Sequence, residues 1–404
     1  MINTPQQRKI LIYFSVLYFV NMASRALFNP FITVYLQEKG IGTQGIGTVM
    51  AFNSLVIILS QPFWGMLADR IQSIRKTLVI CFIFQALLTF SFNLVFSAIL
   101  VGITFCLATF FSAPEGPLLD TWALNSLKGG NNENGLGRLK LWGCIGLSVF
   151  SVVSGLIIKR YSTSFTIPIF AVMLFIIAFV IFRSKFVDIS VSRSIVLKEM
   201  HVGRIIQDKR LIVFLLYIFF MQISHRAAFT FYPVLISSLG GDKSMVGYAS
   251  AIMFLSEALI MYFSKNMLAK MKPIYLIMGS SLFFAIWQVL FSMMTQSWNV
   301  IAAAVLDGPA FAMLTMGVLY YMNELAPKEL RSTYQTVTYA VYYGLSGIAG
   351  NIMGGWVIEH LGFRTMYIAG ACVTLTSTLV FLIVNRNISR RNSNLSSTQH
   401  LSST

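Results

Sequence analysis

Charged side chains interrupt the apolar stretches of this 404-residue sequence at a few positions, and these are the residues that could do chemistry. Glu115 and Asp120 lie in the apolar run before a turn rich in Gly and Asn, and Arg138 and Lys140 open the run after it. Acids in hydrocarbon are costly, so they usually face a partner, a cavity or water. Glu115 and Asp120 are about one and a half helical turns apart, so they point to different faces. Asp120 can therefore pair with Lys140 across the turn, as part of a substrate site, a gate or a structural ion pair.

Four more charged residues lie in the middle of apolar runs: Asp307, Glu257, Arg25 and Arg226. A carboxyl group removed from water favours its protonated form, and an approaching cation favours release of the proton. We predict this proton-coupling chemistry for Asp307 and for Glu257. A static ion pair is the alternative for Asp307, and packing is the alternative to substrate or proton binding for Glu257. The two arginines either bind an anionic substrate or neutralise Asp120, Glu257 and Asp307, and we favour neutralisation.

Long apolar helices must position these residues. The sequence is 56% hydrophobic and only 11% charged, and it contains 34 Phe but 10 Pro. Its apolar runs reach the ~20 residues that cross a bilayer, whereas a β-barrel would show alternating segments of ~10 residues. Because helices satisfy their own backbone hydrogen bonds in lipid, we predict an all-α integral membrane protein with 12 transmembrane helices. The expected spans are residues 10–36, 44–68, 77–95, 98–126, 139–158, 165–183, 210–237, 244–268, 273–293, 299–323, 332–358 and 365–385.

The basic residues set the orientation of these spans. Of the 30 Lys and Arg residues, 23 fall on the cytoplasmic segments of this topology and five on the outer segments. This asymmetry follows the positive-inside rule, so we predict a multi-pass protein of the cell (plasma or inner) membrane with both termini in the cytoplasm. The net charge of +16 then indicates contact with the lipid bilayer and not with nucleic acid. The first apolar run lacks a small-residue cleavage pattern, so we expect it to remain as the first span.

Two short similarities divide the chain into halves. Arg25-Ala26-Leu27-Phe28 is similar to Arg226-Ala227-Ala228-Phe229, 201 residues later. Met66-Leu67-Ala68 is repeated as Met267-Leu268-Ala269 at the same offset. Chance similarity between apolar segments is the alternative. A repeat predicts two pseudo-symmetric six-helix bundles with the substrate between them near the midplane. The expected divisions are an N-terminal bundle (1–184), a cytoplasmic linker (185–209), a C-terminal bundle (210–386) and a disordered cytoplasmic tail (387–404).

Other chemistry is not expected. The four cysteines lie singly in apolar segments, which favours neither a disulfide framework nor a metal site. The sequence has no Walker loop, and its few histidines form no Ser–His–Asp set at a common depth. We interpret His225 as a hydrogen-bonded packing residue that points away from Arg226. The prediction is therefore a protein that is not an enzyme and needs no cofactor or metal.

The loop after residue 68 resembles the signature of the major facilitator superfamily. Gly65-Met66-Leu67-Ala68-Asp69-Arg70, followed by Arg75-Lys76, is similar to the pattern Gly-x-x-x-Asp-Arg with a basic cluster. Glycine permits close approach of a neighbouring helix, and an acid can accept hydrogen bonds from the start of another helix. The resemblance implies the major facilitator fold and a conformational gate made of Gly65, Asp69, Arg70, Arg75 and Lys76. Gln72 stands where the signature has a further Gly.

Other stretches resemble the lactose permease-like oligosaccharide–proton symporters and the phenylpropionate permease group. Gln61-Pro62-Phe63-Trp64-Gly65 is similar to the end of the second helix in the first group, and residues 136–146 are similar to the start of the fifth helix in both. The resemblance implies that Asp120 occupies the place of a sugar-binding acid. Lys140 stands in place of an essential Arg but lacks the bidentate fork of that residue. Leu147 replaces the Trp on which a galactoside stacks, so galactosides are not the expected substrate.

The second half carries two further correspondences. Glu257 matches the position of a second sugar-binding acid, and Asp307-Gly308-Pro309 resembles the Glu-x-Pro that holds the transported proton. Ala304 replaces the His one turn earlier, so the proton partner must differ. The predicted function is uptake of a sugar-like or small organic solute by proton symport, by a monomer. The alternatives are proton-coupled efflux of sugars or drugs and, in another class, a membrane sensor or scaffold. The substrate-binding candidates are Asp120, Lys140, Arg25, Arg226, Glu257 and Glu115.

Overall fold

A computed structural model of the chain describes residues 5–95, 97–127, 135–184, 186, 208–327 and 330–401, and these residues are almost entirely helical. The first half of the chain contains α1 (Pro5–Ala26), η1 (Asn29–Phe31), α2 (Ile32–Glu38), α3 (Thr43–Ile71), α4 (Ile74–Ser91), α5 (Ala98–Ser112), α6 (Glu115–Leu127), α7 (Gly135–Arg160) and α8 (Thr163–Phe182). Its helices pack α1 against α7 and α4 against α8. Residues 187–207, most of the predicted linker, lie outside the described residues.

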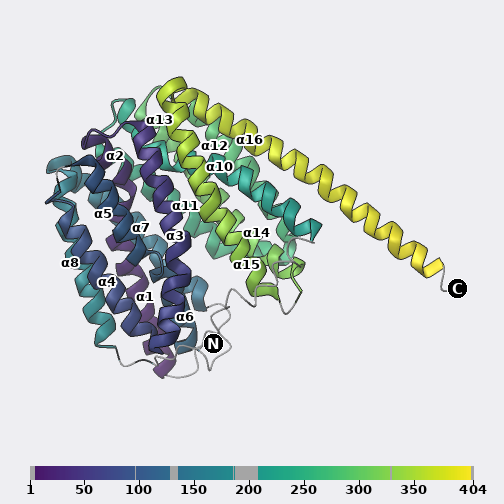
Figure 1. Cartoon of the computed structure of the whole chain (residues 1–404), viewed down its shortest axis with the longest axis horizontal. Coiled ribbons are helices and arrows are strands. Elements are labelled where there is room, and N and C mark those ends of the chain that lie inside the picture. The colour runs from purple at the N-terminus through teal and green to yellow at the C-terminus, as the bar shows by residue number, and fades with distance from the viewer. Residues whose placement is uncertain are drawn as a thin grey trace.

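The second half repeats this arrangement. It contains α10 (Lys209–Ser238), α11 (Lys243–Lys270), α12 (Pro273–Ser292), α13 (Ser297–Ala303), η3 (Ala304–Leu306), α14 (Asp307–Leu325), α15 (Arg331–Tyr339), η5 (Ala340–Leu345) and α16 (Ser346–Leu401). Within it, α10 packs against α16 as α1 does against α7, and α12 packs against α16 as α4 does against α8. Figure 1 shows the two halves side by side, with α3 of the first half next to the beginning of α16 of the second half.

Eleven stretches among the described residues are long and apolar enough to span a membrane. The last of them, Thr333–Arg386, has 54 residues and would be about 80 Å long as one helix, far more than the ~30 Å of a bilayer core. Its helix α16 breaks at Gly362, where φ is +81°, and Figure 1 shows it turning back there. This last stretch therefore makes two crossings, which gives the twelve predicted from the sequence.

Several predicted spans are interrupted instead of continuous. The run 10–36 breaks at Asn29–Phe31, and the run 98–126 breaks between Ser112 and Glu115. Each break contains a proline, Pro30 or Pro114, which lacks an N–H and disfavours a helical residue before it. The run 299–323 passes through the 3₁₀ turn Ala304–Leu306. These breaks place Arg25, Glu115 and Asp307 at helix ends inside the membrane, where free backbone groups can meet charged side chains.

The predicted disordered tail is helical over most of its length. Helix α16 extends to Leu401, so residues 387–401 continue the last span and do not form a coil. Polar residues after an apolar helix can keep its hydrogen-bond pattern because each added residue extends a helix that is already nucleated. Residues 402–404 lie outside the described residues.

The two halves meet closely at one end, which we call the closed end. Helix α3 lies along α16, and α7 lies along α11. Glycines make both contacts possible: a Cβ atom at Gly47 would overlap the carbonyl oxygen of Asn351, and a Cβ atom at Gly247 would overlap that of Ser151. Gly355 has the same role, because a Cβ atom there would overlap the backbone of Thr43.

Polar contacts connect the halves at the same end. The Lys159 ammonium lies 2.7 Å from the Asp242 carboxylate, and Lys243 pairs with Glu38. Glu359 accepts hydrogen bonds from the Thr43 hydroxyl and from the backbone N–H of Gln44. Because each contact joins the first half to the second, these groups hold the closed end together.

The opposite end, where Ser184 and Asp208 lie, is looser, and we call it the linker end. A Cβ atom at Gly65 or Gly137 would have open space around it, and the Lys140 side chain is 45% exposed. The prediction that Gly65 allows a close helix approach is therefore not met in this conformation. Among the described residues, the halves converge at the closed end and leave Lys140 partly exposed at the linker end.

We expect the Lys159–Asp242 ion pair to hold equally across pH 5 to 8. Burial acts to raise the pKa of Asp242, but Lys159 and the hydrogen bonds from Ser244 and Met245 outweigh it, so this pKa lies below its usual value. A carboxylate with a lowered pKa contributes stability above its unfolded pKa, ~3.9, and loses it only as the pH falls through the folded value. Asp242→Asn keeps the helix cap and should lower Tm by the same amount at pH 5 and pH 8. A loss that shrinks steadily from pH 8 to pH 5 would contradict this assignment.

Candidate functional site

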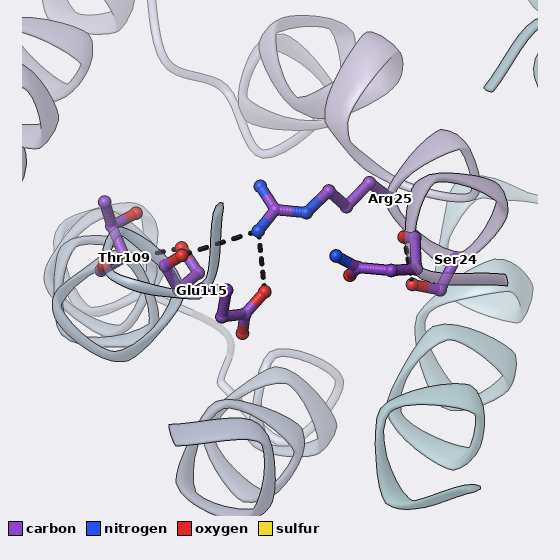
Figure 2. A network of polar contacts seen from close by, with 6 residues as sticks. Ser24, Arg25, Thr109 and Glu115 are labelled. Atoms are coloured by element: carbon purple, nitrogen blue, oxygen red, sulfur yellow. Dashed lines mark hydrogen bonds and ion pairs between the residues drawn. The ribbon is translucent and has the colours of Figure 1, made fainter. Parts of the chain in front are cut away.

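Two charged residues of the first half form a buried ion pair at the helix breaks. Arg25 lies in the last turn of α1, and Glu115 is the first residue of α6. The Arg25 Nη2 atom lies 2.6 Å from Glu115 Oε2 and also donates to the carbonyl oxygen of Ser112 at 3.4 Å (Figure 2). The Glu115 side chain is fully buried, at a helix N-terminus that favours negative charge. Arg25 therefore neutralises an acid, as predicted, but the acid is Glu115.

A second pair joins the two sides of the predicted hairpin. The Lys140 Nζ atom of α7 lies 2.9 Å from Asp120 Oδ2 of α6, and the Tyr18 hydroxyl of α1 donates to the other carboxylate oxygen. Both charged side chains are partly exposed. The pairing of Asp120 with Lys140 is confirmed, and so is the prediction that Glu115 and Asp120 point to different surroundings. Arg138 is exposed near the start of α7, and residues 128–134 of the turn lie outside the described residues.

The second half contains a buried pair that the sequence did not predict. His225 Nε2 of α10 lies 3.0 Å from Asp307 Oδ1 at the start of α14, and both side chains are buried. The His225 ring also packs against Phe284, with ring centroids 4.2 Å apart. The interpretation of His225 as a hydrogen-bonded packing residue is confirmed, but the sequence did not identify Asp307 as its hydrogen-bond partner. Its position in an apolar helix, one residue before an arginine, is the only sequence signal.

Glu257 lies on α11 close to this pair. Glu257 is buried, with 8% exposure. Its charged neighbours are Asp307 and, from the first half, Lys140. Gly308 brings the two acids together, because a Cβ atom there would overlap Ser256 and the backbone of Met253 and Glu257. Glu257 thus lies between the Asp120–Lys140 pair of the first half and the His225–Asp307 pair of the second.

Arg226 has a different environment from Arg25. Its guanidinium lies over the ring of Tyr343, 4.7 Å from the centroid, and 5.9 Å from that of Tyr342. Both tyrosines belong to η5, a π-helical segment within the predicted span 332–358. The prediction that Arg226 neutralises an acid is not met, since in the described part of the chain it forms no ion pair and its Nε and Nη2 atoms have no hydrogen-bond partner.

The predicted gate loop lies at the linker end, between α3 and α4. Arg75 donates to the carbonyl oxygen of Ser184, and the Ser73 hydroxyl caps α4 by accepting from the N–H of Lys76 at 3.1 Å. Arg70 is exposed in the last turn of α3. Gln72 ends that helix with φ at +54°, in the left-handed region, which explains why the signature has glycine there.

Replacing Gln72 with glycine should stabilise the protein. A side chain in the left-handed region costs roughly 1 kcal/mol that glycine avoids. Part of this gain is lost because glycine has more freedom in the unfolded chain. We expect Gln72→Gly to raise the free energy of unfolding in detergent by about 0.5 kcal/mol. Gln72→Ala, which keeps the strain, serves as the control, and a glycine variant less stable than the alanine variant would contradict the prediction.

Breaking the Arg25–Glu115 pair should destabilise the protein strongly. Arg25→Met leaves a fully buried carboxylate without its cation, and the loss of one partner of a buried pair typically costs about 3 to 5 kcal/mol. We expect a decrease of about 3 kcal/mol in unfolding experiments, since Arg25 is partly exposed. The double variant Arg25→Met/Glu115→Gln should recover part of the loss, and Arg364→Gln, at an exposed arginine, is the matched control. An Arg25→Met protein as stable as this control would show that the pair contributes nothing.

Known proteins share this architecture. The sequence model of the MFS_1 like family matches residues 11–369. The maltose permease of Geobacillus stearothermophilus is 24% identical over 374 residues, which cover 92% of this chain and 93% of the permease. The uncharacterized transporter YwbF of Bacillus subtilis is 24% identical over 349 residues, 84% of each chain. The multidrug resistance protein MdtG of Proteus mirabilis is 23% identical over 412 residues, 96% of this chain and 98% of that protein. The crystal structure of the nucleoside transporter NupG superposes with a TM-score of 0.82 at 16% identity, over 93% of this chain and 98% of NupG.

Proposed function

Because the chain belongs to the MFS_1 like family of the major facilitator superfamily, we propose that it takes up a sugar-like or small organic solute by proton symport. The family consists of secondary transporters and not of enzymes, so the sensor or scaffold hypothesis is set aside. Its relatives include sugar permeases and drug efflux proteins at low identity, and family membership alone leaves the choice among them open. The charged groups inside the bundles support coupling of transport to protons.

The observation that carries the proposal is the buried pair of His225 and Asp307 beside Glu257. The pair connects α10 to α14 at 3.0 Å, and Glu257 interacts with the same acid from α11. A carboxylate held by a histidine away from water can gain and lose a proton as its partner moves. Asp307 is the proposed proton carrier, Glu257 a second proton or substrate group, and His225 the proton partner.

Alternating access supplies the transport step. The positive-inside rule assigns the linker end to the cytoplasm, so the conformation described above, with the halves in close contact at the closed end, is the proposed inward-facing one. Release of the proton from Asp307 restores its ion pair with His225 and resets the transporter. Protonation from the outside weakens that pair and favours closure of the halves around the solute.

The proposed substrate site lies between the two halves. Asp120 and Lys140 contribute from the first half, and Arg226 and Glu257 from the second. Arg25 and Glu115 support this site by fixing the break between α5 and α6. The loop with Gly65, Asp69, Arg70, Arg75 and Lys76 is the proposed gate that closes the linker end, where Gly65 has the open space for a helix to approach.

Efflux by proton antiport is the second candidate. Similarity to MdtG, whose name describes multidrug resistance, favours it. The same buried acids serve either direction of coupling, because a carboxylate that exchanges protons can bind proton and solute together or in turn.

Proteoliposomes distinguish these candidates. The purified full-length protein is reconstituted, an inward proton gradient is imposed, and accumulation of a panel of radiolabelled sugars and aromatic acids is measured. Symport predicts accumulation above the equilibrium level that disappears when an ionophore collapses the gradient. Accumulation only when the gradient is reversed would favour antiport, and no gradient-dependent movement of any panel member would overturn the proposal.

A further inference from the structure

Three of the interior basic groups are each matched to one acid, and Arg226 is not. Arg25 pairs with Glu115, Lys140 with Asp120 and His225 with Asp307. In the described residues, Arg226 lacks an ion pair, and two of its guanidinium nitrogens, Nε and Nη2, are buried without a hydrogen-bond partner. A buried donor without a partner is costly, and the cost is greater for a charged group. Such a group in a protein that binds solutes suggests that the solute supplies the missing acceptor.

The surroundings of Arg226 fix one face of its guanidinium. Tyr343 and Tyr342 lie against it at 4.7 and 5.9 Å, and Tyr339 stacks on Tyr343, with centroids 5.9 Å apart. We call these three residues the tyrosine cluster. A cation–π contact holds the planar group in place but accepts no N–H hydrogen bond in the plane of the guanidinium. The Nε and Nη2 donors at the edge of the guanidinium therefore have no hydrogen-bond acceptor among the described residues.

The tyrosine cluster sits on an irregular helix. Residues Ala340–Leu345 form a π-helical turn, and such single turns occur frequently at functional sites. The extra residue in the turn rotates the following side chains relative to an α-helix. Tyr342 and Tyr343 are thereby directed together toward Arg226 of α10.

The tyrosine cluster also borders the other charged groups. Tyr339 interacts electrostatically with Lys140 and Asp120 of the first half, and Tyr343 interacts with Glu257 as well as Arg226. Arg226 thus faces the region between the halves where the substrate site is proposed. Its position differs from that of Arg25, which is held by a carboxylate within the first half.

We propose that Arg226 binds an anionic group of the transported solute, a carboxylate or a phosphate, against the tyrosine cluster. The planar guanidinium presents paired N–H donors that match the two oxygens of either group. The inference rests on the proposed transport function and narrows its substrate to organic anions. The competing explanation is that Arg226 only balances the charge of Glu257 at a distance.

Matched probes test this assignment on the purified full-length protein. Each pair differs by its anionic group: glucuronate and methyl glucoside, glucose 6-phosphate and glucose, 3-phenylpropionate and 3-phenylpropionamide. Dissociation constants are measured for the wild type, Arg226→Gln, Arg226→Lys and the control Arg364→Gln. We expect at least one anion to bind more tightly than its neutral partner. Arg226→Gln should weaken the binding of that anion by roughly tenfold or more, as expected for loss of a charged hydrogen bond. Arg226→Lys should weaken the binding less, and the control should leave the dissociation constant unchanged. The pair in which the anion binds more tightly than its neutral partner identifies the kind of anion: a sugar acid, a phosphate or an aromatic acid.

The double variant Arg226→Gln/Glu257→Gln separates the two explanations. If Arg226 only balances Glu257, removal of both charges restores anion affinity, which would overturn the inference. Equal binding of neutral and anionic partners, or binding of none of the three anions, would also overturn it. Proton-driven uptake of a neutral probe would leave the transport proposal intact while this inference fails. Tight anion binding without proton-dependent uptake would support this inference while the transport proposal fails.

Discussion

Replacing Asp307 with asparagine is expected to reduce proton-driven accumulation in proteoliposomes to the level of empty vesicles while solute exchange continues. Asparagine keeps the shape and a hydrogen-bond acceptor for His225, which lies 3.0 Å from the carboxylate, but it cannot take up a proton. The variant resembles the permanently protonated state, so the halves can still close around solute and reopen. Exchange of labelled for unlabelled solute measures that half of the cycle, and gradient-driven uptake measures the coupling.

Two further variants make this result specific. Glu324→Gln removes an exposed acid from the same helix, α14, and should transport normally. His225→Gln keeps a side-chain hydrogen bond to Asp307 but removes the titratable ring, so we expect uptake to persist with a changed pH dependence. Gradient-driven uptake by Asp307→Asn at the wild-type rate would remove Asp307 from the coupling mechanism.

A valine at Gly247 should stop transport by a different route. Gly247 lies where α11 crosses α7, and even a Cβ atom there would overlap the Ser151 carbonyl oxygen and lie 3.1 Å from the Gly155 Cα. A backbone contact cannot yield as a flexible side chain can, so the closed end has to separate. We expect uptake to fall at least tenfold because the substitution disfavours one of the two conformations of the cycle by more than ~1.4 kcal/mol.

Spin labels report that change directly. Labels at the exposed residues Tyr161 and Trp298 lie on opposite halves near the closed end, and their distance should increase in Gly247→Val. Gly137→Val, on α7 where a Cβ atom meets open space, is the matched control and should keep the wild-type distance. A Gly247→Val protein with both the wild-type distance and the wild-type rate would show that this contact is not needed for closure.

The fold was largely predictable because bilayer thickness leaves few choices. The lengths of the apolar runs indicated the membrane crossings. The distribution of lysine and arginine indicated on which side of the membrane each connecting segment lies. The breaks at Pro30, Pro114 and Ala304–Leu306 were not recognised, since apolar content cannot distinguish a continuous helix from two that share one span. The helical residues 387–401 were missed because their polar composition is typical of a coil.

The candidate site was only partly predictable. Charges in apolar runs pointed to residues that form ion pairs in the structure, Arg25, Glu115, Asp120, Lys140 and Asp307, and helical spacing separated Glu115 from Asp120. Pairing across distant helices was correct for Asp120 with Lys140, which a short turn joins. It failed for His225 with Asp307, 82 residues apart, because no local pattern relates them. The contact of Arg226 with Tyr343 depends on a π-helical turn, which has no signal in the sequence.

The coupling of solute to protons can be measured without any imposed gradient. The panel member that accumulates is added outside proteoliposomes that contain a pH-sensitive dye, and the internal pH is followed as the solute enters down its own gradient. Proton symport through Asp307 predicts acidification of the interior in the wild type and in Glu324→Gln, and none in Asp307→Asn. Entry of the solute through the wild-type protein with no change in internal pH, or with an increase, would contradict the proposed mechanism.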